Sequence, residues 1–406
     1  MGLALGALGA CPLEAATPLH HRKQRYLRRR TLWRHGPAPA GTAPDSLNGL
    51  ARARGLRFGS CICTVPFVEH GHHMLASYSD PRYRALFVSQ CGLLVPENEL
   101  KWRALRPSPA TFDFRKADML VDFATSHQMS VRGHTLLWNR PQWFPDWVGK
   151  YNFGSNPWAG AEQLLREHIS TVCGHYGERI FSYDVVNEAI VPETGELTET
   201  VFTKYLGPDA IDLAFQTARA AAPHAQLVYN DFMSWSPTGD KHRAGVLKLL
   251  ERLKKNNVPI DALGIQSHLG ASADGGSSPR FTDIQQNEWS KFLDEVTAMG
   301  LDLVITEFDV NDRDVAGDVA ARDRAIASLA RDYFDLMLGY LRLRYVMCWG
   351  LADKYSWLQR SPPRPDGKAK RPCPYDDQFN AKLLEEVLAV SLATAPVRPD
   401  MNIQPA

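Results

Sequence analysis

The sequence predicts an α/β protein built as a single (β/α)8 barrel, the TIM-barrel class. From residue 56 onward, short apolar segments alternate with longer segments of helical period, and this unit recurs eight times. The apolar segments contain few charges, which is typical of parallel strands that are buried on both faces. Each intervening segment is long enough for the crossover that a parallel pair requires. Eight β-then-α units favour a closed barrel over a doubly wound open sheet.

The eight expected strands are short, largely apolar and bounded by turn residues. They are residues 57–64, 91–95, 129–134, 180–186, 225–230, 261–266, 301–306 and 344–349. The amphipathic segments that follow them are residues 81–89, 116–127, 160–176, 208–222, 239–255, 285–299, 318–341 and 379–391. In residues 239–255, Val246, Leu249, Leu250 and Leu253 recur at helical spacing with charged residues between them, which predicts one buried face.

The barrel is expected to occupy residues 45–392 as one catalytic domain, because (β/α)8 barrels use about 250 residues or more. Residues 1–44 carry a net charge of +6 and are interpreted as a basic, disordered leader and linker, and residues 393–406 as a C-terminal tail. The rest of the chain has a net charge of −5, which argues against nucleic acid as the main partner. A nucleic-acid role for the leader alone stays open. No apolar run approaches the roughly 20 residues of a membrane-spanning helix.

The cysteine pattern favours neither a disulfide scaffold nor a metal site. The seven cysteines are scattered, and Cys61 and Cys63 lack a second pair at the spacing of a zinc site. We therefore expect no metal and no cofactor.

Polar residues collect where the expected strands end. Seven of the eight strands lead into carboxylates, amides, imidazoles or indoles. These residues are Glu97, Asn98, Lys101, His134, Trp138, Asn187, Glu188, Asn230, Asp231, Gln266, His268, Glu307, Asp309 and Trp349. Because the carboxyl ends of barrel strands share one rim, where active sites of this fold lie, we expect these side chains to form the site.

Glu188 and Glu307 follow the fourth and seventh strands, which lie across the barrel mouth from one another. Each directly follows an apolar strand, where a charge is costly unless it is used or paired. Two facing carboxyl groups, with neither a metal cluster nor a phosphate-binding glycine loop in the sequence, favour cleavage of a glycosidic bond.

From about Leu47 to about Val390 the chain resembles glycoside hydrolase family 10, the retaining endo-β-1,4-xylanases. Six motifs, in order along the chain, support this resemblance. They are Pro96-Glu-Asn-Glu-Leu-Lys-Trp102, Gly133-His-Thr-Leu-Leu-Trp138, Asp184-Val-Val-Asn-Glu188, Gly264-Ile-Gln-Ser-His268, Ile305-Thr-Glu-Phe-Asp309 and Trp349-Gly-Leu-Ala-Asp-Lys-Tyr-Ser-Trp357. The fold that the resemblance implies is the barrel inferred above.

The resemblance implies that Glu188 is the general acid/base and Glu307 the nucleophile. A retaining site places its carboxyl groups about 5–5.5 Å apart, and at that distance an ionised nucleophile keeps its neighbour protonated near neutral pH. We expect His268, beside Asp309, to donate to Glu307 and keep it ionised. Asn187 is expected to hold the 2-hydroxyl of the sugar.

The resemblance also implies a set of sugar-binding residues. These are Glu97, Asn98, Lys101, His134, Trp138, Gln266, Trp349 and Trp357. Tyr183 replaces the family's usual Trp, and Phe232-Met233 replaces its usual Tyr-Asn, which removes a hydroxyl from the rim.

The function predicted is endo-hydrolysis of xylan by a monomer without a cofactor. A β-1,4-glucan stays open as the substrate, because size discrimination between xylose and glucose is worth only about 1–3 kcal/mol. A non-catalytic glycan-binding barrel is disfavoured, since it usually lacks one of the two carboxylates. Polymers do not readily enter cells, so we expect a secreted or periplasmic protein, although the N-terminal residues do not show a clear signal segment.

Overall fold

The computed structural model describes residues 40–399, apart from residues 65–67, 70–71, 74–75, 273–282 and 361. All but the last five residues of the predicted leader lie outside the described part of the chain, as do residues 400–406. The Gly/Ser-rich segment that the sequence shows after residue 272 also lies outside it.

Eight parallel strands close into a barrel, which confirms the predicted fold class. The strands are β1 (Arg57–Ile62), β4 (Leu93–Pro96), β5 (Ser130–Trp138), β6 (Ile180–Asn187), β7 (Gln226–Asp231), β8 (Ala262–Ile265), β10 (Asp302–Asp314) and β11 (Leu343–Cys348). They pair in this order, and β11 pairs with both β10 and β1, which closes the ring. A further strand, β9 (His268–Ser272), pairs in parallel with the C-terminal half of β10. Strand β2 (Val68–Glu69) pairs antiparallel with β3 (His72–His73).

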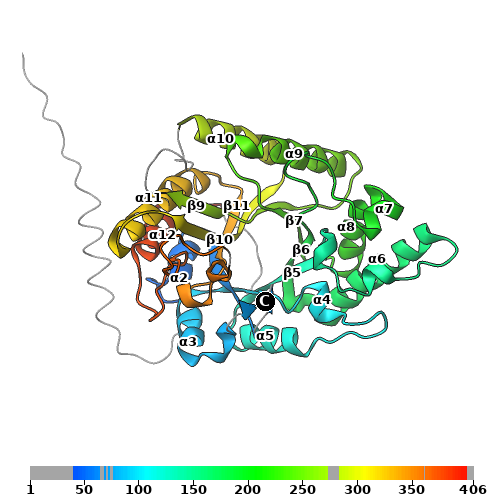
Figure 1. The fold of residues 1–406 in the computed structure, drawn as a ribbon, viewed down its shortest axis with the longest axis horizontal. Coiled ribbons are helices and arrows are strands. Elements are labelled where there is room, and N and C mark those ends of the chain that lie inside the picture. The colour runs from blue at the N-terminus through cyan, green and yellow to red at the C-terminus, as the bar shows by residue number, and fades with distance from the viewer. Residues whose placement is uncertain are drawn as a thin grey trace, which may run out of the picture. The chain divides into compact units, whose positions relative to one another are not determined.

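One crossover helix follows each barrel strand. These helices are α3 (Pro81–Gln90), α5 (Arg115–Ser126), α6 (Pro157–Tyr176), α8 (Asp209–Ala221), α9 (Asp240–Lys255), α10 (Asp283–Ala298), α11 (Val319–Met337) and α12 (Leu383–Thr394). In Figure 1 they surround the strands in chain order, from α3 and α5 at the bottom through α6 and α8 at the right and α9 and α10 at the top to α11 at the left. The shorter helices α2 (Leu47–Arg52), α4 (Trp102–Leu105) and α7 (Val201–Leu206) lie in the connections or before β1.

The helix-period pattern of α9 matches its burial. Val246, Leu250 and Leu253 are fully buried and Leu249 nearly so, whereas Lys248 and Glu251 between them are exposed. Inside the barrel, side chains from several strands form one apolar cluster. Its buried members are Cys61, Leu93, Val95, Val228, Ala262, Val304, Tyr345, Met347 and Trp349. The barrel is therefore a filled core, and its chemistry is confined to the rim.

Two strands are longer than the sequence pattern predicted, and both carry site residues. Strand β5 was expected to end at residue 134 but runs to Trp138, because Trp138 pairs with Asn187 of β6. Strand β10 was expected to end at residue 306 but runs to Asp314, because Asp309 pairs with His268 of β9. Glu307 thus lies within a paired strand, which restricts its backbone more than a loop would.

Packed structure extends on both sides of residues 45–392. The Gly41 N–H donates to the carbonyl of Val88, and the Gly41 carbonyl accepts a hydrogen bond from Asn48. At the other end, the buried guanidinium of Arg398 donates to the carbonyls of Leu338 and Leu343.

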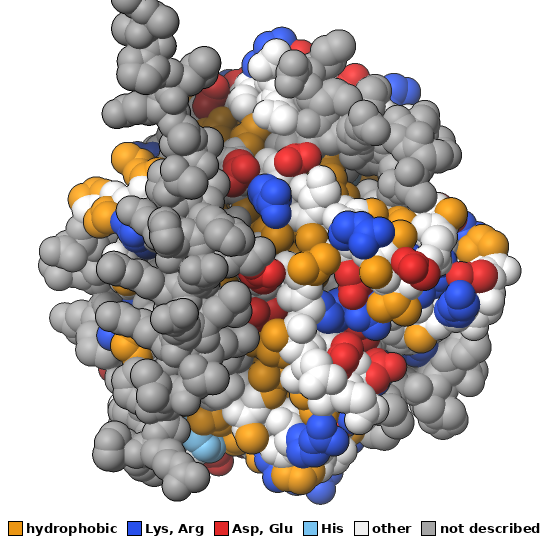
Figure 2. Space-filling model, turned by 90° about the vertical axis from the view of Figure 1, so that its left-hand side faces the viewer, with side chains coloured by type: hydrophobic (Ala, Val, Ile, Leu, Met, Phe, Trp, Pro, Cys, Tyr) orange, Lys and Arg blue, Asp and Glu red, His pale blue; other side chains and the backbone are white. Residues whose placement is uncertain are grey.

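The described surface is mixed in charge. On the face drawn in Figure 2, basic and acidic side chains are interspersed with apolar ones. Within the described part of the chain, no helix has the length and apolar character that a membrane crossing needs.

Candidate active site

Glu188 is the first residue beyond strand β6, and its backbone is held in an unusual conformation. Its φ angle is +54°, in the left-handed region that residues with a side chain rarely adopt. The Glu188 N–H donates to the Asn230 carbonyl of β7 at 2.9 Å. Nε2 of Gln266 donates to Oε1 of Glu188, also at 2.9 Å. Such strained backbone persists where surrounding contacts over-determine it, which is common in active sites.

Glu307 lies on β10, and both of its carboxylate oxygens have hydrogen-bond partners. Nδ2 of Asn230 donates to Oε1 at 2.8 Å, and Nε2 of His268 lies 3.2 Å from Oε2. Nδ1 of His268 lies 2.9 Å from Oδ1 of Asp309. The structure thus brings together Glu307, His268 and Asp309, which the sequence placed in one group.

The surroundings shift the pKa values of the two glutamates in opposite directions. Burial and the negative charges of Asp231 and Glu307 raise the pKa of Glu188, although hydrogen bonds from Gln266 and Trp138 oppose this shift. A carboxyl group with a raised pKa keeps its proton to a higher pH, which favours the role of general acid.

The pKa of Glu307 moves the other way. Burial alone would raise it, but the hydrogen bonds from His268 and Asn230 and the nearby imidazoles of His134 and His268 lower it to about 2. Burial opposes protonation of His268, and the carboxylates of Asp309 and Glu307 overcome this opposition and raise its pKa. Glu307 is therefore ionised, as a nucleophile must be.

Behind the two glutamates lies a buried charged network that orients His134. Arg132 forms an ion pair with Asp184, and both side chains are almost fully buried. The second oxygen of Asp184 lies 2.9 Å from Nδ1 of His134, whose ring also approaches Oε1 of Glu307 at 3.9 Å. A His held by a carboxylate on a strand has a fixed ring orientation.

The predicted sugar-binding residues after β4 form one polar group beside Trp138. Nζ of Lys101 donates to Oδ1 of Asn98 at 2.9 Å and lies 4.9 Å from the centre of the Trp138 ring. Glu97 is buried, and this burial raises its pKa to about 7 against the opposing charge of Lys101. Carboxyl, amide and ammonium groups held together in this way can bind the hydroxyls of one sugar ring.

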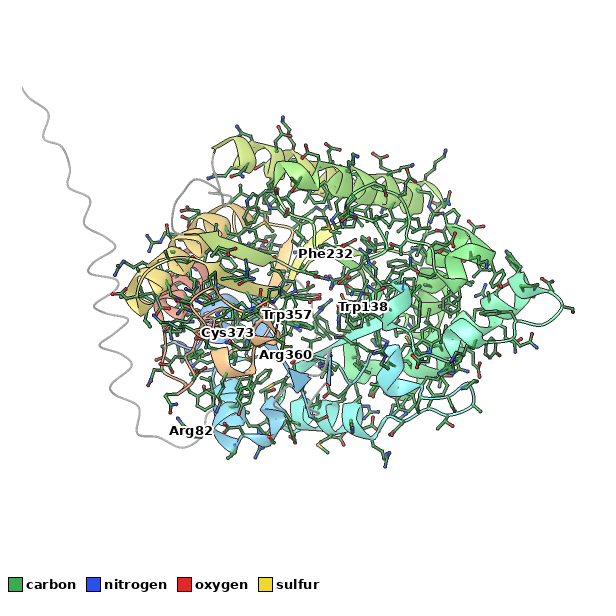
Figure 3. All side chains as sticks on the ribbon, viewed as in Figure 1. Arg82, Trp138, Phe232, Trp357, Arg360 and Cys373 are labelled. Carbon is green, nitrogen blue, oxygen red and sulfur yellow. The ribbon has the colours of Figure 1, made fainter. Side chains whose placement is uncertain are left out.

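The two tryptophans that follow β11 contact His134, His268 and Asp309. Nε1 of Trp357 donates to Oδ2 of Asp309 at 2.7 Å, and its ring lies 5.1 Å from that of His268. Trp349 packs edge-on against His134 at 5.2 Å. Figure 3 places Trp138 and Trp357 on different elements around the middle of the barrel.

The Asn187 amide lies among the catalytic groups, 2.9 Å from that of Asn230 and 3.4 Å from Oε1 of Glu188. All thirteen predicted site residues therefore lie in this one region. Their roles in binding and catalysis stay predictions.

Asn230, which the sequence placed on the rim without a role, contacts the catalytic groups, and Arg140 and Trp143 lie in the site although the sequence did not predict them. Asn230 links the two glutamates, since its side chain contacts Glu307 and Asn187 and its carbonyl accepts from Glu188. The sequence feature that indicates Asn230 is its position at the C-terminal end of β7. Arg140 lies beside Glu188, with its Nε 3.7 Å from Oε2. Trp143, which the sequence left unassigned, stacks on Trp138 at 4.5 Å.

Among the described side chains, no group of three or more His, Cys, Asp or Glu residues is arranged to hold a metal ion. The chemistry that the described residues offer is acid/base and nucleophilic.

Two carboxyl groups whose pKa values are shifted in opposite directions, on the rim of a (β/α)8 barrel beside polar side chains and tryptophans, define a class of protein, the glycoside hydrolases. Comparison with known proteins specifies the family. Residues 46–389 match the model of glycosyl hydrolase family 10, and the chain belongs to this family.

Relatives and solved structures agree with this assignment. The chain is 32% identical over 313 residues to a β-1,4-xylanase of Dictyoglomus thermophilum, covering 74% of this chain and 82% of that relative. It is 31% identical over 365 residues to endo-1,4-beta-xylanase 5 of Pyricularia oryzae, covering 87% and 81%. The crystal structure of native xylanase 10B from Thermotoga maritima matches with a TM-score of 0.72 at 26% identity, covering 86% of this chain and 99% of that one.

Proposed function

We propose that the protein is an endo-1,4-β-xylanase that cleaves internal xylan linkages by a retaining double displacement, with Glu188 as acid/base and Glu307 as nucleophile. The observation that carries the proposal is the membership of glycosyl hydrolase family 10, and the opposite shift of the two pKa values supports the assignment of the two roles. A retaining glycosidase needs one carboxyl group protonated and the other ionised before substrate cleavage begins. The names of the relatives support xylan as the substrate.

In the first step, a carboxylate oxygen of Glu307 attacks the anomeric carbon while Glu188 gives its proton to the glycosidic oxygen. The bond between that carbon and oxygen breaks, and the shortened chain leaves as an alcohol. The product of the step is a glycosyl ester on Glu307 and a carboxylate on Glu188. The imidazole of His268 and the amide of Asn230 hold the attacking carboxylate in place.

In the second step, the Glu188 carboxylate takes a proton from water, and the water oxygen attacks the anomeric carbon. The ester bond to Glu307 breaks, so both glutamates return to their starting protonation states. Two inversions at the same carbon leave the β configuration unchanged. Asn187, between Asn230 and Glu188, is suited to hold the 2-hydroxyl of the sugar during both steps.

The experiment that tests the proposal is release of reducing ends from β-1,4-xylan and, in parallel, from carboxymethylcellulose, with product anomers followed by proton NMR. We expect xylo-oligosaccharides that appear first as β-anomers. Release of reducing ends from the glucan alone would show that the substrate is a β-1,4-glucan and not xylan. Products that appear first as α-anomers would overturn the retaining mechanism.

We further propose that the enzyme works outside the cytoplasm, because its polymeric substrate does not readily enter cells. We also propose that it works as a monomer. Activity in the culture medium or periplasm of the source cells would support this location. Activity confined to the cytosolic fraction would overturn it.

A further inference from the structure

Arg140 places a positive charge directly beside the proposed acid/base. It is two residues beyond the end of β5, and its Nε lies 3.7 Å from Oε2 of Glu188. Both side chains are largely buried, with 15% of Arg140 and 14% of Glu188 exposed. In the described part of the chain, Glu188 is the one acidic side chain within 4 Å of the Arg140 guanidinium.

Contacts with two further segments hold the guanidinium in place. Nη2 donates to the carbonyl of Ile190 at 2.9 Å, in the segment that follows β6. The Cζ atom lies 5.7 Å from the centre of the Phe232 ring, which follows β7. A cation over an aromatic face is attracted by the ring's negative centre. Arg140 is thus fixed between the ends of three neighbouring strands, unlike a long surface cation that moves in solvent.

The other charged groups that face Glu188 are negative. Glu307 approaches from β10 and Asp231 from β7, and both disfavour a second negative charge. Asp231 in turn lies 3.1 Å from Nε2 of His242 on α9 and accepts a hydrogen bond from Tyr229.

The remaining polar groups that contact Glu188 are neutral. The Gln266 amide and the Trp138 indole donate hydrogen bonds, and the Asn187 amide lies beside them. Within the described residues, Arg140 is therefore the cation closest to the Glu188 carboxyl group, at a distance where charge matters even in water.

We propose that Arg140 is a positioning residue that stabilises the carboxylate form of Glu188, the form that exists after its proton has passed to the leaving group. This inference rests on the proposed double displacement. Between the two steps, Glu188 carries a negative charge in a buried site, which is costly without a compensating charge. The guanidinium supplies that charge, which favours release of the proton in the first step and keeps Glu188 ionised, as a general base must be, when water attacks in the second.

The test compares Arg140→Gln, which removes the charge, with Arg140→Lys, which keeps it. The control is Arg103→Gln, because Arg103 donates to the carbonyls of Gln142 and Phe144 and so anchors the same segment without contacting Glu188. In the pH dependence of kcat/KM on xylohexaose, the loss of activity at high pH reports deprotonation of Glu188. We expect Arg140→Gln to move this limb upward by about one pH unit, as Coulomb's law gives at this distance even with the dielectric constant of water.

A second readout follows the base step. With 2,4-dinitrophenyl β-xylobioside, whose leaving group needs no acid, hydrolysis of the glycosyl ester limits kcat. The acidic limb of kcat then reports ionisation of Glu188 in that ester, and it should move upward in Arg140→Gln as well. The acidic limb of kcat/KM, which reports Glu307, should stay in place in every variant.

The outcomes separate a charge effect from a structural one. If Arg140→Gln loses activity equally at all pH values with unmoved limbs, or if Arg140→Lys shifts as far as Arg140→Gln, the proposal is overturned. Thermal unfolding of each variant shows whether it folds. A wild-type protein that hydrolyses neither substrate overturns the proposed function instead, and unmoved limbs in an active enzyme overturn this inference alone.

Discussion

Nε2 of His268 lies 3.2 Å from Oε2 of Glu307, while the opposite ring nitrogen faces Asp309. With a carboxylate at each ring nitrogen, the imidazole is stabilised as the cation, and its raised pKa agrees with this. His268 therefore links the two carboxylates: Asp309 stabilises the imidazolium, and the imidazolium stabilises the ionised form of Glu307.

We expect His268→Gln to move the acidic limb of kcat/KM upward by at least about one pH unit. Activity needs Glu307 ionised, so it is lost as the pH falls through the pKa of this group. Without the imidazolium that pKa rises, and the loss begins at a higher pH. His175→Gln is a matched control, since His175 pairs with Asp118 on the surface at 2.7 Å and should leave both limbs in place. A shift of the alkaline limb alone in His268→Gln would contradict this role.

Removing each glutamate should give a different dependence on the leaving group. We expect Glu307→Ala to lose turnover on every substrate by about 10⁴-fold or more, because no ester can form. Glu188→Ala should lose about 10²–10⁴-fold on xylan but much less in ester formation with dinitrophenyl glycosides, which leave without protonation. Pre-steady-state release of dinitrophenol measures that step directly. Equal losses on activated and unactivated substrates would show that the two roles are assigned wrongly.

Trp357 is expected to contribute to substrate binding. Its indole donates to Asp309 and lies beside His268, at the edge of the site. Trp357→Ala should raise KM several-fold, since an aromatic contact contributes about 0.5–1.5 kcal/mol. Trp158→Ala, which removes a tryptophan that is 51% exposed at the start of α6, should leave KM unchanged. Equal KM values for the two variants would exclude a binding role for Trp357.

The extension of β10 beyond the site is expected to depend on a buried ion pair. Asp312 is fully buried, lies 2.6 Å from Nη2 of Arg322 and accepts a hydrogen bond from the Arg371 N–H at 2.9 Å. Asp312→Ala leaves a buried guanidinium uncompensated and should cost about 3–5 kcal/mol in the free energy of unfolding. Asp314→Ala, which breaks an exposed pair with Arg313, should cost less than about 1 kcal/mol. Urea unfolding of both variants measures the difference, and similar midpoints would contradict it.

The sequence was sufficient for the barrel because each strand and helix carries its own local pattern. Apolar segments of strand length and the stripe of α9 need no knowledge of distant residues. Glu188 and Glu307 could be found for the same reason, since each directly follows or continues an apolar strand.

Features that depend on contacts across the fold were missed. The extensions of β5 and β10 contain polar residues, and their strand conformation comes from pairing with Asn187 and His268. Arg140 follows no periodic pattern, and its approach to Glu188 depends on how two loops meet. Asn230 was visible at a strand end, but its contact with Glu307 required the barrel to close.

The measurement that tests the central claim most directly is covalent trapping with 2,4-dinitrophenyl 2-deoxy-2-fluoro-β-xylobioside, followed by mass spectrometry of the proteolysed enzyme. The fluorine slows hydrolysis of the ester, so the glycosyl group should stay on the protein. We predict one added 2-deoxy-2-fluoroxylobiosyl group per chain, on the peptide that contains Glu307. A label on any other residue, or no label on an enzyme that hydrolyses xylan, would contradict the double displacement through Glu307.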